Sequence, residues 1–137
     1  MLLHGTSRVS KQWPDDCWIA LGRWLQARGF ACVLPWGDGI EKLRAKRLAA
    51  VIPDARVLER QPLDATARVI AGASLVIGVD TGLLHLAAAY QVPLAGIYVA
   101  SDPGLTGPVG AGRIVVVTGV EKAPTAPEVS AAVERLL

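Results

Sequence analysis

The sequence predicts an α/β fold, a Rossmann-like three-layer α/β/α sandwich built around a parallel six-stranded sheet. Short apolar runs rich in branched residues alternate along the chain with segments of strong helix formers. This alternation is typical of parallel strands joined by right-handed crossover helices. The 137 residues, 52% of them apolar, are enough for one well-buried core. A single domain over residues 1–137 is therefore expected.

The individual elements follow from the same pattern. Apolar runs predict six strands, at residues 1–4, 30–34, 55–58, 75–79, 94–99 and 114–117. Helix formers predict five helices, at residues 14–29, 40–51, 63–71, 83–89 and 125–137. Pro14 fits the first turn of its helix and Gly29 closes that helix, while Thr125 caps the last one. The glycine-rich segment 100–112 must be a loop between the fifth and sixth strands.

We expect the strands in the order 3-2-1-4-5-6. In that order strands one and four are neighbours at the point where the connections reverse direction, and ligands of open α/β sheets bind at the carboxyl ends of such strands. The loop at residues 6–11 is therefore expected beside the turn at residues 80–85.

Composition and charge exclude several classes of function. The net charge of +2 and the absence of a Lys/Arg block argue against a nucleic-acid partner. No apolar run approaches the roughly 20 residues of a membrane-spanning helix, and no signal peptide is recognisable, so a cytoplasmic protein is expected. Two cysteines, Cys17 and Cys32, lack the spacing of a zinc site. We expect no metal.

The turn after the strand at 75–79 carries the most suggestive chemistry. Asp80, Thr81 and Gly82 are turn and cap residues that open a helix, and His85 follows about one helical turn after Asp80. The unpaired N–H groups of that helix, with the positive end of its dipole, suit a phosphate. The local pattern supports a second interpretation equally well, in which the turn only caps a helix and His85 packs against its neighbours.

Two further segments have the same two interpretations. Thr6, Ser7 and Lys11 supply hydroxyls and a cation that suit a phosphate, or they belong to an ordinary solvated loop. Glu41 lies just past the second strand, where α/β nucleotide-binding folds place an acidic residue that hydrogen-bonds ribose hydroxyls. An acidic residue in the first turn of a helix is equally well explained by its favourable interaction with the helix dipole. The cations of that helix are predicted to form its solvated face, at Lys42, Arg44, Lys46 and Arg47.

Several fingerprints are missing from the chain. No G-x-G-x-x-G follows the first strand and no G-x-x-x-x-G-K-[ST] occurs, so dinucleotide and P-loop sites lack their motifs. A dinucleotide-dependent oxidoreductase is thereby disfavoured, and no cofactor is expected. There is no D-x-D pair for a divalent cation on a diphosphate and no G-x-S-x-G elbow of a serine hydrolase.

Four separated motifs resemble a known family. HGTSRVSKQWP, LPWGDGIEKLRAKRLA, VIGVDTGLLHLAAA and SDPGLTGPVG occur in the order found in the C-terminal half of the bacterial lipopolysaccharide heptosyltransferases, most closely those of the heptosyltransferase I type. These are inverting, two-domain enzymes of glycosyltransferase family 9 with the GT-B architecture. The resemblance spans nearly the whole chain, and D-T-G-x-x-H is its most diagnostic motif.

The resemblance implies that this half binds the donor, ADP-L-glycero-β-D-manno-heptose. Lys11, with the hydroxyls of Thr6 and Ser7, would contact the diphosphate and the sugar, and Lys11 would offset the charge that grows on the departing ADP. Thr81 and Gly82 would offer backbone N–H groups to the same phosphates.

The remaining implied roles concern the two ends of the donor. Glu41 would hold the ribose hydroxyls, and the adenine would lie against the backbone of residues 60–63. Asp80 would bind heptose hydroxyls, and His85 would lie near the sugar-phosphate end. Lys11 and Asp80 are the expected catalytic residues.

The resemblance also implies a missing half. A GT-B enzyme carries its acceptor site and its general base in an N-terminal domain, which is not within these 137 residues. The whole enzyme would transfer heptose to Kdo of the lipid A inner core at the cytoplasmic face of the bacterial inner membrane, and this domain alone would be inactive. The alternative from another class is a free-standing, non-catalytic nucleotide or nucleotide-sugar binding module.

Overall fold

The strands of the protein form two parallel sheets. The computed structural model describes residues 1–6, 8–99, 108, 110, 112–119 and 122–137. The main sheet has the order β1 (Leu2–Leu3), β4 (Val76–Val79), β5 (Leu94–Tyr98) and β6 (Ile114–Thr118). A second sheet pairs β2 (Val33–Leu34) with β3 (Arg56–Val57). All pairs are parallel, as predicted.

The expected single six-stranded sheet is wrong, because the ladder of hydrogen bonds stops between β1 and β2. These two strands contact each other, so the strands keep the predicted order 3-2-1-4-5-6, but they belong to different sheets. A side chain bridges the gap at the carboxyl ends. The His4 ring, just past β1, places Nε2 2.9 Å from the carbonyl oxygen of Pro35, just past β2. Because a carbonyl oxygen only accepts, Nε2 carries the proton and donates it.

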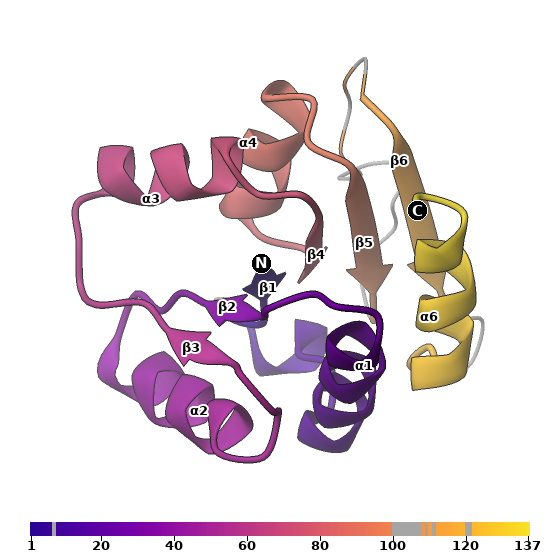
Figure 1. The fold of residues 1–137 in the computed structure, drawn as a ribbon, viewed down its shortest axis with the longest axis horizontal. Coiled ribbons are helices and arrows are strands. Elements are labelled where there is room, and N and C mark those ends of the chain that lie inside the picture. Colours follow the sequence, from indigo (N-terminus) through magenta and orange to yellow (C-terminus); the bar gives the residue numbers. More distant parts are fainter. Residues whose placement is uncertain (7, 100–107, 109, 111, 120–121) are drawn as a thin grey trace.

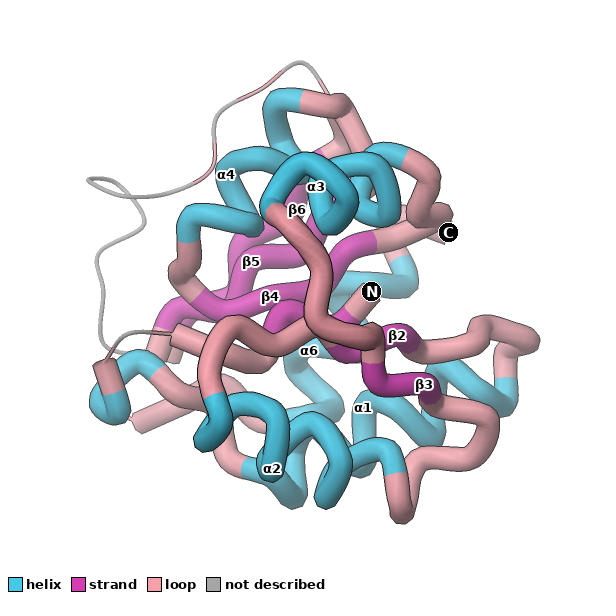
Figure 2. The backbone as a smooth tube through the Cα atoms, turned by 90° about the vertical axis from the view of Figure 1, so that its left-hand side faces the viewer, coloured by secondary structure: helices cyan, strands magenta, loops and turns pink. Residues whose placement is uncertain are grey.

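Helices cover both faces of the strands, which confirms the three-layer α/β/α architecture (Figures 1 and 2). One layer contains α1 (Asp15–Ala27), α2 (Gly39–Ala49) and α6 (Ala126–Glu134). The other contains α3 (Leu63–Ala71) and α4 (Gly82–Ala89). A short 3-10 helix, η1 (Val9–Lys11), lies between β1 and α1.

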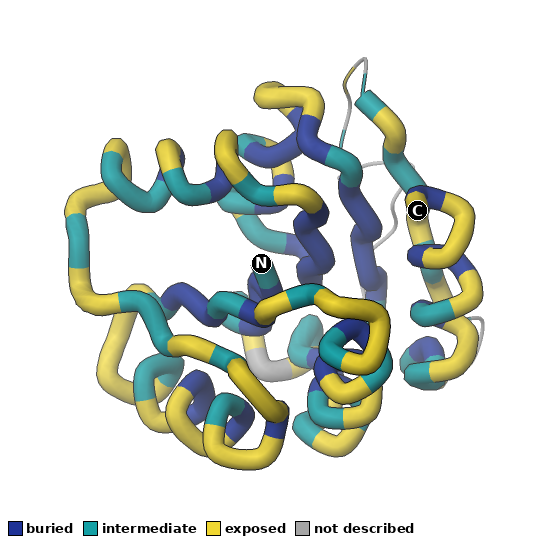
Figure 3. The backbone as a smooth tube through the Cα atoms, viewed as in Figure 1, coloured by how far each residue is buried: buried dark blue, intermediate teal, exposed yellow. Residues whose placement is uncertain are grey.

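Alternation along the strands divides the apolar side chains between these two layers. In β4, Ile77 and Val79 pack in the cluster with α1 and α6, while Val76 packs in the cluster with α3 and α4. Successive side chains of a strand point to opposite faces, so a strand covered on both sides must be apolar throughout. β4 and β5 are buried along their whole length (Figure 3).

The predicted element boundaries agree best with the structure where the local sequence signal is strongest. The helix at 63–71 has the predicted limits, and α1 and α2 differ by one or two residues at each end. The strands predicted at 30–34 and 55–58 shrink to two residues each. Most of the predicted loop at 100–112 lies outside the described residues, as does Ser7.

Candidate functional site

The turn after β4 places a carboxylate and a helix N-terminus at the carboxyl edge of the main sheet. Asp80 directly follows the buried strand and is itself 8% exposed. Thr81 is the N-cap of α4 with an extended backbone, and its side chain makes no capping hydrogen bond. The first N–H groups of α4, which begins at Gly82, are therefore not capped by the side chain of Thr81. Together with the positive end of the dipole they suit an anion.

Asp80 lies between the segment after β1, which carries Thr6 and Lys11, and His85 of α4. Lys11 Nζ lies 3.0 Å from Asp80 Oδ2, and His85 Nε2 lies 3.9 Å from Oδ1. Thr6 donates from Oγ1 to the Asp80 carbonyl oxygen over 3.1 Å. The Lys11 side chain remains 23% exposed. An ammonium has three N–H groups, so Lys11 can donate to a second anion while it stays paired with Asp80.

The negative charge of Asp80 also affects the pKa of a tyrosine in the neighbouring strand β5. Burial, assisted by the nearby Asp80 carboxylate, raises the pKa of Tyr98 in β5 to about 12. The tyrosine therefore stays neutral at physiological pH, and the largely buried Asp80 carboxylate is paired with the Lys11 ammonium.

Glu41 lies at the N-terminus of α2, opposite the loop that follows β1. The Asp38 side chain caps this helix by accepting from the Glu41 backbone N–H at 2.8 Å. Glu41 Oε2 in turn accepts from the Gly37 N–H at 3.0 Å. A Cβ atom placed on Gly5 would lie 2.5 Å from the same oxygen, so the two segments approach each other closely at this point. The second oxygen of Glu41 is available to accept from a ligand.

A pocket of about 470 Å³ opens between these segments. It is lined by residues that follow β1, β2, β3 and β4, including Thr6, Trp36, Glu41, Gln61 and Thr81. Its position at the carboxyl ends of parallel strands is the one in which open α/β sheets bind ligands. Another pocket, of about 380 Å³, lies at the opposite, amino edge of the strands, and its lining contains none of the predicted site residues.

The structure thus brings most of the predicted site residues to one edge. Thr6, Glu41 and Thr81 line the pocket, whereas Lys11, Asp80, Gly82 and His85 lie beside Thr6 and Thr81, outside the lining formed by the described residues. Ser7 lies outside the described residues.

Sequence reasoning did not single out two aromatic residues of this edge. His4 is fully buried, and burial lowers its pKa to about 4, so its ring is neutral at pH 7. Trp36 donates from Nε1 to the Leu58 carbonyl oxygen at 2.7 Å, and the Lys42 ammonium lies 4.9 Å from its ring centroid. The signal that could have found them was their position: His4 is the last residue of the first predicted strand, and Trp36 lies two residues past the end of the second.

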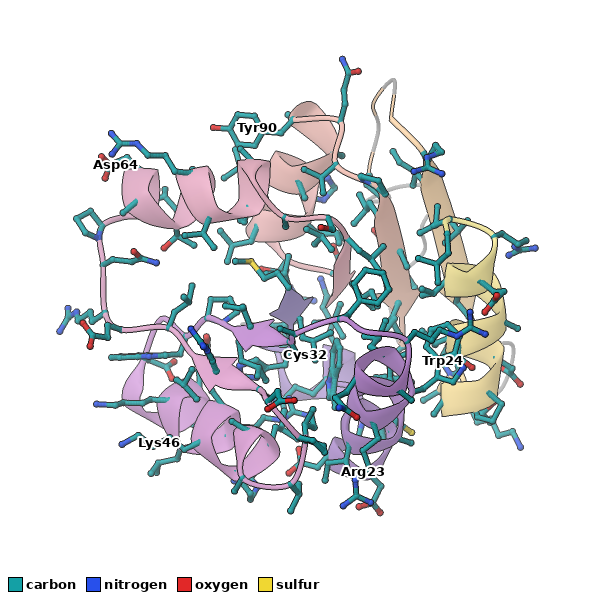
Figure 4. The ribbon with its side chains drawn as sticks, in the orientation of Figure 1. Arg23, Trp24, Cys32, Lys46, Asp64 and Tyr90 are labelled. Atoms are coloured by element: carbon teal, nitrogen blue, oxygen red, sulfur yellow. The ribbon has the colours of Figure 1, made fainter. Side chains whose placement is uncertain are left out.

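One prediction for α2 is wrong. Arg44 was expected on the solvated face of the helix, but it is 7% exposed. It lies on the side of α2 that contains the buried Ala45 and Leu48, and Asp15 at the start of α1 neutralises it at 2.8 Å. By contrast, Lys46 and Arg47 are exposed as predicted, and Lys46 points outward in Figure 4.

The described residues contain neither a metal-binding cluster nor a membrane-spanning helix. No group of three or more histidine, cysteine or acidic residues in the described part of the chain is placed to hold a metal ion. None of the described helices has the length and apolar character needed to cross a bilayer.

The fold and the pocket at the carboxyl ends of its parallel strands define the class of α/β ligand-binding domains. The family model for glycosyltransferase family 9 (heptosyltransferase) matches residues 1–133, and the chain belongs to this family. It is 44% identical over 114 residues to lipopolysaccharide heptosyltransferase 1 of Pseudomonas aeruginosa, a match that covers 83% of this chain and 32% of the relative. The chain therefore spans about a third of the length of this relative.

Solved structures agree with this assignment. The Escherichia coli heptosyltransferase WaaC with ADP superimposes with a TM-score of 0.93 and 39% identity, over 99% of this chain and 43% of that one. The same enzyme with ADP-2-deoxy-2-fluoro heptose gives a TM-score of 0.89 and 37% identity, over 99% of this chain and 42% of that one.

Proposed function

We propose that this chain is the donor-binding half of an inverting heptosyltransferase. The whole enzyme would transfer L-glycero-D-manno-heptose from ADP-heptose to Kdo of the lipid A inner core. The observation that carries the proposal is the Lys11–Asp80 ion pair beside the N-terminus of α4, where the Thr81 side chain makes no capping hydrogen bond, at the edge of a ligand-sized pocket. The similarity to structures named with ADP and an ADP-heptose analogue supports the donor class.

The diphosphate would lie between Lys11 and the N-terminus of α4, within reach of the backbone N–H groups of Thr81 and Gly82. During transfer the bond between heptose C1 and the phosphate oxygen breaks, and ADP leaves with the electron pair. Negative charge therefore grows on the phosphate. A fixed cation and a helix N-terminus directed at that position stabilise the charge as it develops.

The adenosine would occupy the pocket of about 470 Å³. Glu41 holds one carboxylate oxygen on the Gly37 N–H, which orients the other toward the ribose hydroxyls. The adenine would lie against the backbone of residues 60–63, where Gln61 lines the pocket.

The heptose would lie on the far side of the diphosphate, near Asp80 and His85. Asp80 would accept from sugar hydroxyls with the oxygen that does not pair with Lys11, and His85 would lie at the sugar-phosphate end. Ser7 is proposed to contact the diphosphate or the sugar from the same loop as Thr6.

The acceptor chemistry is assigned to the part of the longer relatives that this chain does not span. There a base takes the proton of the Kdo hydroxyl while that oxygen forms the new bond to heptose C1. The contact of the whole enzyme with the cytoplasmic face of the inner membrane belongs to the same proposal. This chain alone is expected to bind donor and to transfer no heptose.

Binding measurements on this chain test the proposal. ADP and ADP-heptose should raise its melting temperature, since a ligand that binds only the folded state stabilises it by mass action, and NAD should not. Lys11→Ala should weaken ADP binding by about tenfold or more, because it removes a charged hydrogen-bond donor. Lys46→Ala, which removes an exposed lysine from the outer side of α2, is the matched control.

Two outcomes would contradict the proposal. Equal ADP affinity in the Lys11→Ala variant and the unmodified chain would show that the diphosphate does not bind at Lys11. Heptosylated product from the chain alone, mixed with ADP-heptose and Kdo-lipid A, would contradict the assignment of the acceptor site to another part of the enzyme.

A further inference from the structure

We propose that Arg44 of α2 is a positioning residue that fixes the loop carrying Thr6 and Lys11 by binding both of its ends. The inference rests on the proposed function, because it concerns the diphosphate part of that site. Arg44 itself would not touch the donor.

All three guanidinium nitrogens of Arg44 are used. Nη1 donates to the carbonyl oxygen of His4 at 3.2 Å, Nη2 donates to the carbonyl oxygen of Trp13, and Nε donates to Asp15 Oδ1 at 2.8 Å. His4 precedes the loop that begins at Gly5, and Trp13 follows it. One side chain from a different helix therefore holds the start and the end of the segment.

Both attachment points are rigid. Trp13 is fully buried, and its indole Nε1 donates to the Pro124 carbonyl oxygen at 2.7 Å. His4 is also fully buried, and its ring is held by Pro35. Lys11 lies two residues before Trp13. The end of the loop that Arg44 holds through Trp13 is therefore the end that carries Lys11, whose ammonium pairs with Asp80.

The chemistry of arginine fits this task better than that of lysine. A planar guanidinium presents its N–H groups in a fixed fork, whereas an ammonium is a single point with freely rotating donors. An ammonium has three N–H groups on one atom, whereas the guanidinium of Arg44 reaches two carbonyl oxygens and a carboxylate from three separate nitrogens. Partial burial alone would raise the pKa of Asp15, but hydrogen bonds from Arg44 and Arg47 outweigh burial and lower it, so the carboxylate that balances Arg44 is ionised.

The chain offers a matched control. Arg47 binds the other oxygen of the same carboxylate, at 2.7 Å from Asp15 Oδ2, but it is 60% exposed and has no contact with the loop among the described residues. Arg47→Met removes one cation from the cluster and leaves both loop contacts of Arg44 in place.

The test compares ADP with adenosine as ligands of the unmodified chain, Arg44→Met, Arg44→Lys and Arg47→Met. Arg44→Met and Arg44→Lys should bind ADP about tenfold more weakly but adenosine at most about twofold more weakly. Only the phosphates meet Lys11, whereas Gly5 and Thr6 at the start of the same loop also line the pocket assigned to adenosine. In an Arg44→Lys background, Lys11→Ala should cost little further ADP affinity. A purely structural role would weaken both ligands together, and that result, or unchanged ADP affinity in both Arg44 variants, would overturn the inference.

A measurement without ligand separates this inference from the proposed function. Hydrogen exchange of the peptide from Gly5 to Trp13 should be faster by about tenfold in Arg44→Lys, and unchanged in Arg47→Met, while β4 exchanges as before. If the unmodified chain bound no ADP, the proposed function would fail. The positioning role would then be upheld or overturned by the exchange of this peptide.

Discussion

Replacing His4 by glutamine should change how the stability of the chain depends on pH. The His4 ring donates from Nε2 to the Pro35 carbonyl oxygen, and the glutamine amide can supply the same donor without titrating. Burial lowers the pKa of His4 from 6.5 to about 4. In the unfolded chain the ring is hydrated and recovers its ordinary pKa.

The magnitude follows from the difference between these two values. As the pH falls below 6.5 the unfolded state binds a proton that the folded state does not bind until about pH 4. The stabilising contribution is therefore complete above pH 6.5 and is lost as the pH falls toward 4. Between pH 7 and pH 4 the free energy of unfolding should fall by about 3 kcal/mol through His4 alone.

Urea unfolding followed by circular dichroism, at pH 7 and at pH 4, measures this loss. The neighbouring charged groups Arg44, Asp15 and Arg47 are common to both proteins, so the effect of their titration cancels in the comparison. The unmodified chain should lose about 3 kcal/mol more than His4→Gln over this interval. A difference below about 1 kcal/mol would refute the reasoning that His4 is buried and neutral.

Two glycines give further predictions. Gly78→Ala would place a Cβ 2.7 Å from Leu3 Cβ, between β4 and β1, where neither backbone can move away easily. The free energy of unfolding should therefore fall by roughly 1–3 kcal/mol. Gly39→Ala, whose Cβ would meet nothing within 4 Å, should leave the free energy of unfolding nearly unchanged. Gly5→Ala would displace the flexible end of Glu41, so ADP affinity measured by calorimetry should fall several-fold with little change in melting temperature; an unchanged affinity would separate Glu41 from the nucleotide.

The region around β4 and α4 could be predicted from sequence because its signals are local. The apolar run ending at Val79 specifies a strand buried on both faces, and the Asp80–Thr81–Gly82 turn marks the helix start. The predicted strand order placed the loop that carries Lys11 beside the turn that carries Asp80. It could not predict that the two side chains form an ion pair.

Where partners come from distant segments, sequence alone was insufficient. An apolar run such as residues 30–34 predicts a buried strand, yet Ala31 is exposed and only Val33–Leu34 join a ladder, because pairing depends on where the neighbouring strand lies. The same limit explains Arg44. Its cationic neighbours on α2 are exposed to different degrees, and only the positions of Asp15 and of two loop carbonyls make this one a buried residue.

The division of the strands into two sheets has a consequence for how the site can be retuned. Glu41 stands on the unit of β2, β3 and α2, whereas Asp80 belongs to the main sheet. Among the described residues, no continuous backbone ladder sets the spacing between the two carboxylates. The side chains of His4 and Arg44 instead bridge the seam, the gap between β1 and β2. Single substitutions at this seam can therefore shift one end of the cleft against the other while every strand keeps its register.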